Sequence, residues 1–329
     1  MKISVMGLGM VSKLGNTEAL ERLLARDRIE PGSLPSAHTL AIDFPTDSNV
    51  PQQLLRRMSH FAKISLLSAS YALKDSGLDL AGKSVGIIQG SVYGPIISGI
   101  QAFDDLIDFG DNQLSPTNFS GSVFNASATY LSLAFNIQGC MLTHTSGLDT
   151  LYNSLLTASL WLESKAADYV AMGIGDEYTV YFDTGFRSDN QQTGLLPTCE
   201  GWTTFILSNT ENAKYGKVEF GCLKTMPGTK NQKNIYSVWH DRIQAAEFRN
   251  HAEENQACFP VALRGSYPSA AAFDLALALV CARSKRFPVY DASSGNYEIQ
   301  NLNRNEKIRC YHALENDDPV YYEIRSNPN

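Results

Sequence analysis

The chain has 329 residues, of which 43% are hydrophobic and 19% charged, so it is a globular protein rather than a disordered, collagen-like or coiled-coil chain. Its 34 Asp and Glu residues outnumber its 27 Lys and Arg residues, and the net charge of −7 argues against a nucleic-acid partner. Six scattered cysteines without zinc-ligand spacing indicate reduced thiols and a cytoplasmic location. We expect no signal peptide and no membrane span, because no stretch approaches about 18 consecutive apolar residues.

The first elements are predicted from short local signals. Residues 3–6 indicate a buried strand that enters a tight turn at Gly7-Leu8-Gly9. A helix over 16–26 is expected with Asn16 as its cap. Dense apolar positions after Ser59 predict a largely buried helix that Gly77 ends.

The same alternation of strands and helices continues along the chain. The expected strands are 84–89, 140–145, 169–173, 203–208 and 320–324, and the expected helices are 125–135, 147–166 and 269–283. Such alternation predicts βαβ units and a mostly parallel sheet with helices on both faces. The polar, Asn-rich stretch 291–307 is interpreted as turns.

Four segments, taken together, suggest a family. They are 5–15 (VMGLGMVSKLG), 56–88 with its RRMSHFAK and ALKDSGL runs, 115–177 followed by Glu200-Gly201, and 264–272 (RGSYPSAAA). In this order, across residues 3–288, the chain resembles β-ketoacyl synthases of the thiolase-like superfamily.

The resemblance implies an α/β fold with five α-β-α-β-α layers and two pseudo-symmetric halves, in a protein that is usually dimeric. We place an N-terminal ketosynthase-like half at 1–208 and a shortened C-terminal half at 209–329. It also implies a chemistry, in which a cysteine thiolate at a helix N-terminus, two histidines and a lysine act on acyl and malonyl units.

Those catalytic residues are missing at the matching positions. Where the family has its nucleophilic cysteine, this chain reads Thr143-His144-Thr145-Ser146-Gly147-Leu148-Asp149. Ser266 stands in place of the family's histidine and Val261 in place of its lysine. Residues 310–318 replace the glycine-rich turn that closes the active site, and His240 and His251 are interpreted as solvated. The resemblance therefore predicts no catalytic residue.

Several other signals have simpler interpretations than a binding site. The glycines at 7 and 9 lack the third glycine and the following acidic residue of a dinucleotide fingerprint, so no cofactor is expected. Ser146 with His144 suggests a serine nucleophile, although a serine before a helix is ordinarily its cap. The pairs Asp176-Glu177 and Asp317-Asp318 form no calcium loop and are interpreted as solvated turns, so no metal is expected.

The sequence therefore predicts a non-catalytic, chain-length-factor-like subunit. It would form a heterodimer with an active β-ketoacyl synthase and stabilise it in type II polyketide biosynthesis. The short second half favours aryl polyene synthesis, and an acyl carrier protein is expected to reach this subunit through the complex. Two alternatives stay open: an acyltransferase or thioesterase that uses Ser146 and His144, and a stand-alone acyl-binding homodimer.

The resemblance places the subunit interface at residues 115–145, where strands of two subunits would join edge to edge. The expected interface residues are Phe119, Val123, Phe124, Asn125, Tyr130, Leu131, Phe135, Ile137, Leu142 and Thr143. Apolar side chains among them would leave an exposed patch in a monomer. Tyr130→Asp or Leu131→Asp is accordingly predicted to disrupt the complex.

Overall fold

The computed structural model describes residues 1–36, 38–46, 50–80, 82–110, 114–181, 199–223, 232–236, 258, 260–265, 267, 269–291, 293–303, 306–313 and 319–325. Its strands are β1 (Lys2–Val11), β2 (Arg28–Ile29), β3 (Val85–Gly90), β4 (Met141–His144), β5 (Tyr169–Asp176), β6 (Gly201–Ser208), β7 (Lys217–Cys222), β8 (Gln232–Tyr236), β9 (Arg286–Asp291), β10 (Asn296–Asn301), β11 (Lys307–Ala313) and β12 (Pro319–Arg325).

The helices account for most of the predicted helical segments. They are α1 (Thr17–Leu24), α2 (Gln52–Leu55), α3 (His60–Ser76), α4 (Ile96–Phe109), α5 (Pro116–Ser122), α6 (Ala126–Phe135), α7 (Thr150–Glu163), α10 (Val261–Arg264) and α11 (Ala271–Ser284), with 3-10 turns η1 (Pro31–Ser33) and η3 (Gly147–Asp149). In the described part of the chain, no helix is long and apolar enough to cross a membrane.

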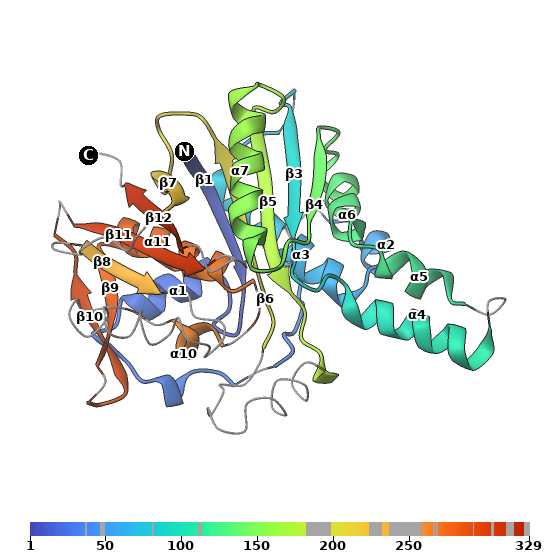
Figure 1. Ribbon diagram of the computed structural model, residues 1–329, viewed down its shortest axis with the longest axis horizontal. Coiled ribbons are helices and arrows are strands. Elements are labelled where there is room, and N and C mark those ends of the chain that lie inside the picture. The colour runs from blue at the N-terminus through green and yellow to red at the C-terminus, as the bar shows by residue number, and fades with distance from the viewer. Residues whose placement is uncertain are drawn as a thin grey trace.

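One nine-stranded sheet runs through the molecule in the order β4-β3-β5-β6-β1-β7-β12-β11-β8 (Figure 1). The strands of the first half lie on one side of the β1–β7 pair and those of the second half on the other. The expectation of a mostly parallel sheet is wrong. Only β3–β4, β3–β5 and β8–β11 are parallel among the described pairs, because β6 and β12 run antiparallel to both of their neighbours.

The predicted caps of the first helices are confirmed. The Asn16 side chain accepts the Ala19 amide in α1, and Ser59 Oγ accepts the Ala62 amide at the start of α3. Gly77 ends α3 with a φ of 62°, a left-handed conformation that glycine adopts without strain. These local signals act within one turn of helix, which is why the sequence predicts them correctly.

The expected turn at Gly7 to Gly9 is wrong, because β1 continues straight through both glycines. Helix α3 packs so closely on this strand that a Cβ on Gly7 would lie 2.4 Å from the Ala72 carbonyl oxygen. A Cβ on Gly9 would meet the Ser68 carbonyl oxygen at 2.0 Å. The glycines therefore allow a strand and a helix to approach closely.

Two clusters of buried side chains hold the layers together. Helices α7 and α11 bury side chains in the larger cluster, which also contains strand residues of both halves. Helices α3 and α6 share the smaller cluster with β3 and cover the other face of the first half (Figure 1). A second sheet, β2-β10-β9, packs its Phe287 and Tyr297 into the larger cluster. The interpretation of 291–307 as turns alone is wrong, because this stretch contains strand β10.

Candidate functional site

The turn between β4 and α7, called the nucleophile turn below, is where the resemblance leads us to expect the family's nucleophile. Thr150 organises it, since the Thr150 hydroxyl accepts the Ser146 amide at 3.1 Å and donates to the Gly147 carbonyl at 2.7 Å. Ser146 precedes η3 without a side-chain capping bond, so the structure does not show the capping role expected of it. No cysteine occurs in the sequence between Cys140 and Cys199. The turn therefore presents a serine but no thiol.

His144 is not arranged as a base for Ser146. Its Nε2 lies 3.0 Å from the Thr157 hydroxyl on α7, and partial burial lowers its pKa. The hydrogen bonds between described residues include none that joins His144 to Ser146. The serine–histidine pair that the sequence suggested is therefore not assembled.

A histidine from the other half of the chain reaches the turn. The buried His312, on β11, donates from Nε2 to the Leu148 carbonyl at 2.7 Å. Burial lowers the pKa of His312 more than this bond raises it, so the ring is neutral at pH 7. The segment expected to replace the family's glycine-rich turn thus does contact the nucleophile turn, through His312. The sequence gave no signal for this contact, because 164 residues separate its partners.

A buried ion pair lies where the family's second-half motif aligns. Arg264 Nε donates to Asp274 Oδ1 at 2.7 Å, and a second guanidinium nitrogen donates to Oδ2 at 3.1 Å. Both side chains have no exposed surface. Burial alone would lower the pKa of Arg264, but the charge and hydrogen bonds of Asp274 raise it. Ser266 and the side chain of Val261 lie outside what the structure describes.

The pair Asp176-Glu177 is buried, which corrects its interpretation as a solvated turn; Asp317-Asp318 lies outside the described residues. Asp176 accepts hydrogen bonds from the Ser91 hydroxyl and from the amides of Val92, Tyr93 and Ser269. Glu177 accepts the Ile97 amide, at the start of α4, at 2.9 Å. These carboxylates at the end of β5 anchor the segment that leads into α4.

Glu200 completes this buried acidic cluster. It accepts the Leu40 and Tyr178 amides, and its Oε1 lies 2.7 Å from His60 Nε2. Burial raises the pKa of Asp176, and it raises that of Glu177 to about 7. Burial would lower the pKa of His60, but the hydrogen bond and charge of Glu200 raise it above its usual value. Within the described ranges, no three His, Cys, Asp or Glu side chains form a metal site.

Strand β4 is an edge of the large sheet, with β3 on one side and no described strand on the other (Figure 1). Of the ten expected interface residues, five are exposed, namely Phe119, Val123, Phe124, Asn125 and Leu142. Three are half-buried, namely Tyr130, Phe135 and Thr143. Leu131 and Ile137 are buried in the cluster under α6, so they contribute to folding and their assignment to the interface is wrong. The helical pattern did not show which side of α6 faces the core.

The same side of the molecule exposes apolar residues that the sequence analysis missed. Met141 on β4 and Leu133 on α6 are exposed, as are several side chains of α4. Helices α4 and α5 project from the β4 side of the sheet (Figure 1). The exposed apolar surface therefore extends over α4, α5, α6 and β4.

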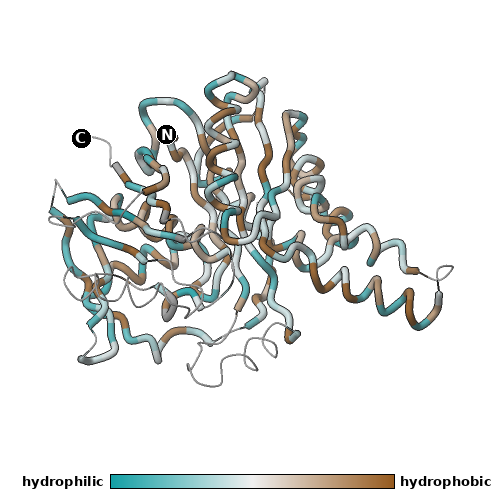
Figure 2. Tube along the Cα trace, in the orientation of Figure 1, coloured by the Kyte–Doolittle hydropathy of each residue, from teal (hydrophilic) through white to brown (hydrophobic). Residues whose placement is uncertain are grey.

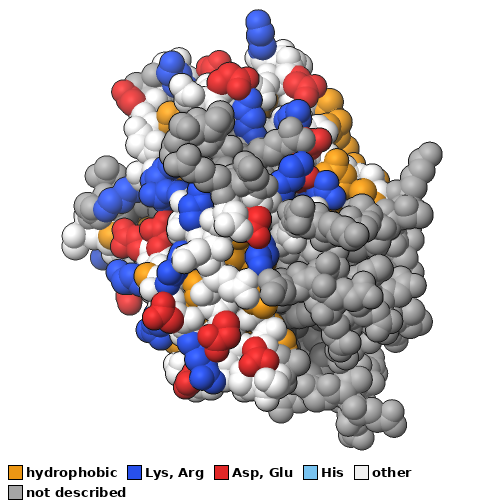
Figure 3. Space-filling view, turned by 90° about the vertical axis from the view of Figure 1, so that its left-hand side faces the viewer, with side chains coloured by type: hydrophobic (Ala, Val, Ile, Leu, Met, Phe, Trp, Pro, Cys, Tyr) orange, Lys and Arg blue, Asp and Glu red, His pale blue; other side chains and the backbone are white. Residues whose placement is uncertain are grey.

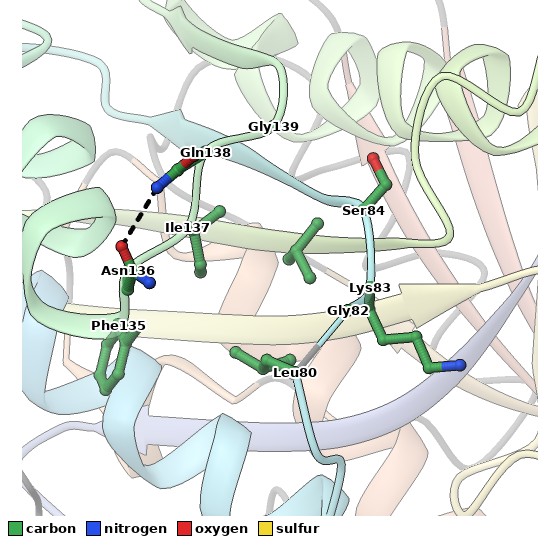
Figure 4. A pocket seen from close by; sticks show the side chains of 10 residues that line it. Leu80, Gly82, Lys83, Ser84, Phe135, Asn136, Ile137, Gln138 and Gly139 are labelled. Carbon is green, nitrogen blue, oxygen red and sulfur yellow. Dashed lines mark hydrogen bonds between the residues drawn. The ribbon is translucent and has the colours of Figure 1, made fainter.

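A polar pocket of about 470 Å³ opens at the opposite end of β3 and β4 from the nucleophile turn (Figure 4). It is lined by residues 80, 82–85 and 135–139, and Gln138 donates to Asn136 at its rim. None of the groups at the turn reaches it, so the pocket is separate from the candidate site.

Comparison with known proteins supports the family resemblance. Residues 34–192 match the family described as "Beta-ketoacyl synthase, N-terminal domain". A curated relative, the 3-oxoacyl-[acyl-carrier-protein] synthase 2 of Coxiella burnetii (strain RSA 493 / Nine Mile phase I), is 24% identical over 228 residues. That match covers 63% of this chain and 55% of the relative, so the chain spans about half the length of the curated relative.

Three solved structures cover 99% of the chain. The ishigamide ketosynthase/chain length factor has a TM-score of 0.74 at 12% identity over 99% of its own chain. A beta-ketoacyl synthase from Burkholderia phymatum STM815 has a TM-score of 0.73 at 15% identity over 100% of its chain. AntDE:AntF, a type II PKS acyl-carrier protein in complex with its ketosynthase bound to the hexaketide, has a TM-score of 0.73 at 13% identity over 99% of its chain.

The predicted fold class is thereby confirmed. The chain shares the thiolase-like fold of these three structures, and its residues 34–192 match the β-ketoacyl synthase N-terminal domain.

Proposed function

We propose that this protein is a non-catalytic, chain-length-factor-like subunit that forms a heterodimer with an active β-ketoacyl synthase and stabilises it. The observation that carries the proposal is the state of the nucleophile turn. It contains no cysteine, and no hydrogen bond between described residues joins the Ser146 hydroxyl to a base. A ketosynthase needs a thiolate at this point, since the thiolate is the group that accepts the acyl chain.

The groups around the turn are used for structure instead. His312 is neutral and donates to the turn's own backbone, while Arg264 and Asp274 pair with each other in the interior. Burying a charge pair costs less free energy when its hydrogen-bond donors are satisfied within the protein than when they are left open for a substrate. This arrangement supports a scaffold role on the ketosynthase fold.

The side of the molecule that carries strand β4 supports the proposal of a partner subunit. Strand β4 leaves its outer edge unpaired among the described strands, and Met141 and Leu142 are exposed on it. An exposed, partly apolar strand edge favours pairing with another strand. Burying it against a ketosynthase subunit would stabilise both proteins by mass action.

The proposal also specifies a biosynthetic pathway and a cellular location. Two of the structural neighbours are a ketosynthase/chain length factor and a type II PKS ketosynthase with its carrier protein. We extend the proposal accordingly to type II polyketide biosynthesis, with aryl polyene synthesis as the expected pathway. An acyl carrier protein would reach the subunit through the complex. The six free thiols are consistent with a reducing, cytoplasmic location.

Co-expression with an active β-ketoacyl synthase of the same organism tests the proposal. The ketosynthase alone carries a tag, and the purified material is examined by native mass spectrometry. We expect a 1:1 complex, and a Leu142→Asp variant should reduce its yield because it places a charge on the β4 edge. Absence of this chain from the purified ketosynthase, with the chain well folded by itself, would refute the heterodimer.

A further inference from the structure

The buried acidic cluster joins the ends of two neighbouring strands. Asp176 ends β5 and pairs with Gly201, the first residue of β6, which brings Glu177 close to Glu200. The exposed fractions of the three acidic residues are 2% for Asp176, 4% for Glu177 and 0% for Glu200. In Figure 2, β5 is hydrophobic over most of its length and hydrophilic where it ends. Removing such carboxylates from water costs free energy unless partners compensate for their charge.

The cluster has few positive partners. Among the described residues, one ion pair joins it to a cation, His60 Nε2 with Glu200 Oε1 at 2.7 Å. The charge of Lys63, on the next turn of α3, acts on His60, and the ring of His38 stacks on that of Tyr178 at 5.0 Å. On the face shown in Figure 3, by contrast, Lys and Arg are interleaved with Asp and Glu. A fully ionised cluster would hold three negative charges, of which a protonated His60 balances one, so the cluster favours retention of a proton.

The hydrogen bonds indicate which carboxyl retains that proton. Asp176 accepts four hydrogen bonds, from one hydroxyl and three amides. Glu200 accepts two amides and contacts His60. Among the described residues, Glu177 accepts only the Ile97 amide, at 2.9 Å. Hydrogen bonds donated to a carboxylate stabilise its charged form. Glu177 is therefore the least stabilised anion of the three.

The groups that face Glu177 act on it in opposite directions. The Ile97 amide and the N-terminal dipole of α4 favour the anion, and so does His60 on α3. Burial of the carboxyl and the charges of Glu200 and Asp176 favour the protonated form. Burial is the largest of these effects, and it raises the pKa of Glu177 to about 7. The protonated and ionised forms are therefore both accessible near neutral pH.

The segment 91–97 connects this cluster to the nucleophile turn. Its first residue, Ser91, donates its amide to the His144 carbonyl at 3.1 Å and its hydroxyl to the cluster. At its other end, the Ile97 amide is held by Glu177. His144 ends β4, the strand that leads into the nucleophile turn. Loss of the bond to Glu177 would thus loosen a segment that also contacts the start of this turn.

We propose that Glu177 is a proton-operated latch, which holds the segment 91–97 against the end of β5 while it is protonated and releases the segment when it ionises. The protonated carboxyl keeps its carbonyl oxygen as an acceptor for the Ile97 amide. On ionisation the proton passes to solvent, and the new charge lies beside two other carboxylates. Opening of the segment then admits water to this charge, which lowers its free energy. The latch is a property of this chain alone and does not rest on the proposed function.

Hydrogen exchange of the purified chain tests the latch. The amides of 91–97 are followed by mass spectrometry at pH 6 and pH 8, with rates corrected for the intrinsic effect of pH. We expect their protection to fall about tenfold, because the pKa of Glu177 is about 7 in the closed form and 4.5 in the open form. Low urea should leave exchange in this segment unchanged and accelerate it in β7, which only global unfolding exposes. Protection that does not fall, or that responds to urea in step with β7, would overturn the proposal.

Two variants assign the effect to one carboxyl. Glu177→Gln cannot ionise, so its protection of 91–97 should differ less than twofold between pH 6 and pH 8. The matched control Glu163→Gln changes an exposed glutamate of α7 that also accepts one hydrogen bond, from Ser159, and should keep the tenfold fall. A fall that persists in Glu177→Gln and disappears in His60→Gln would overturn the assignment to Glu177.

A direct titration does not depend on any variant. In ¹³C NMR of the wild type with labelled glutamate carboxyls, one signal should titrate near pH 7. Titration of every glutamate near its normal pKa of 4.5 would show that Glu177 ionises without cost, and this result would also overturn the latch.

Discussion

The nucleophile turn and the projecting helices α4 and α5 use their side chains in opposite ways. Around the turn, polar groups are buried and paired within the chain: His312 with Leu148, and Arg264 with Asp274. On these helices, apolar side chains such as Phe103 and Ile107 face solvent beside the exposed Asp104 and Asp108. The first region uses its polar groups within the chain, whereas the second exposes an apolar surface of the kind that a partner protein can bury. The difference is what the proposed association with a partner subunit requires.

The largest effect is expected where a predicted interface residue is in fact part of the core. Leu131→Asp puts a carboxylate into the cluster under α6 and should lower the free energy of unfolding by more than about 4 kcal/mol. Leu133→Asp, two positions along the same helix, should change it by less than about 0.5 kcal/mol, because Leu133 is 63% exposed. Urea denaturation compares the two variants. Similar stabilities would contradict the orientation of α6.

Breaking the buried ion pair should have the next largest effect. Asp274→Ala leaves the Arg264 charge buried without its main partner and should cost about 3 to 5 kcal/mol of unfolding free energy. Replacing both by Arg264→Met and Asp274→Leu should recover most of that loss, since apolar residues of similar size need no partner. Denaturant unfolding of the single and double variants measures the difference. If the single variant were as stable as wild type, the pair would have no structural role.

The buried acidic cluster that anchors the start of α4 should make stability depend on pH. Glu177 has a pKa of about 7 in the folded protein, against a normal value of 4.5. The free-energy cost of ionising this buried carboxyl is therefore absent below about pH 4.5. Stability should fall as pH rises from 4.5 through 7, by about 3 kcal/mol from this group. The raised pKa of His60 acts in the same direction, since its attraction to Glu200 is lost as pH rises through that value.

The Glu177→Gln variant isolates the contribution of Glu177. Glutamine keeps an acceptor for the Ile97 amide and cannot ionise, so the variant should be more stable than wild type at pH 8 and similar at pH 5. Thermal unfolding across this pH range gives the comparison. A wild-type protein that is more stable at pH 8 than at pH 5, with an unchanged variant profile, would contradict the burial of this carboxyl.

The smallest effect is expected at the turn itself. Ser146→Ala should change the unfolding free energy by less than about 0.5 kcal/mol, because Thr150 rather than the serine side chain organises η3. An acyl probe for serine nucleophiles should label neither the wild type nor the variant. Labelling that Ser146→Ala abolishes would instead establish the acyltransferase or thioesterase alternative.

Local sequence signals predicted the helices whose ends are controlled by nearby residues. Asn16, Ser59 and Gly77 act on amides or backbone angles within one turn, so they mark α1 and α3 correctly. The order of four family segments likewise predicted the fold. The wrong interpretations share another cause. Gly7 and Gly9 serve contacts with α3, more than 50 positions away, and so gave a false signal of a turn.

At the candidate site, too, some properties follow from the sequence and others only from the tertiary structure. The absence of a cysteine between Cys140 and Cys199 is determined by the sequence alone, and with it the lack of a thiol nucleophile at the turn. Only the tertiary structure decided that Asp176 and Glu177 are buried, that His312 reaches Leu148, and that β4 is an edge strand. Burial and strand order arise from contacts between distant segments, whose free energies depend on how the layers pack. A local pattern of residues does not contain that information.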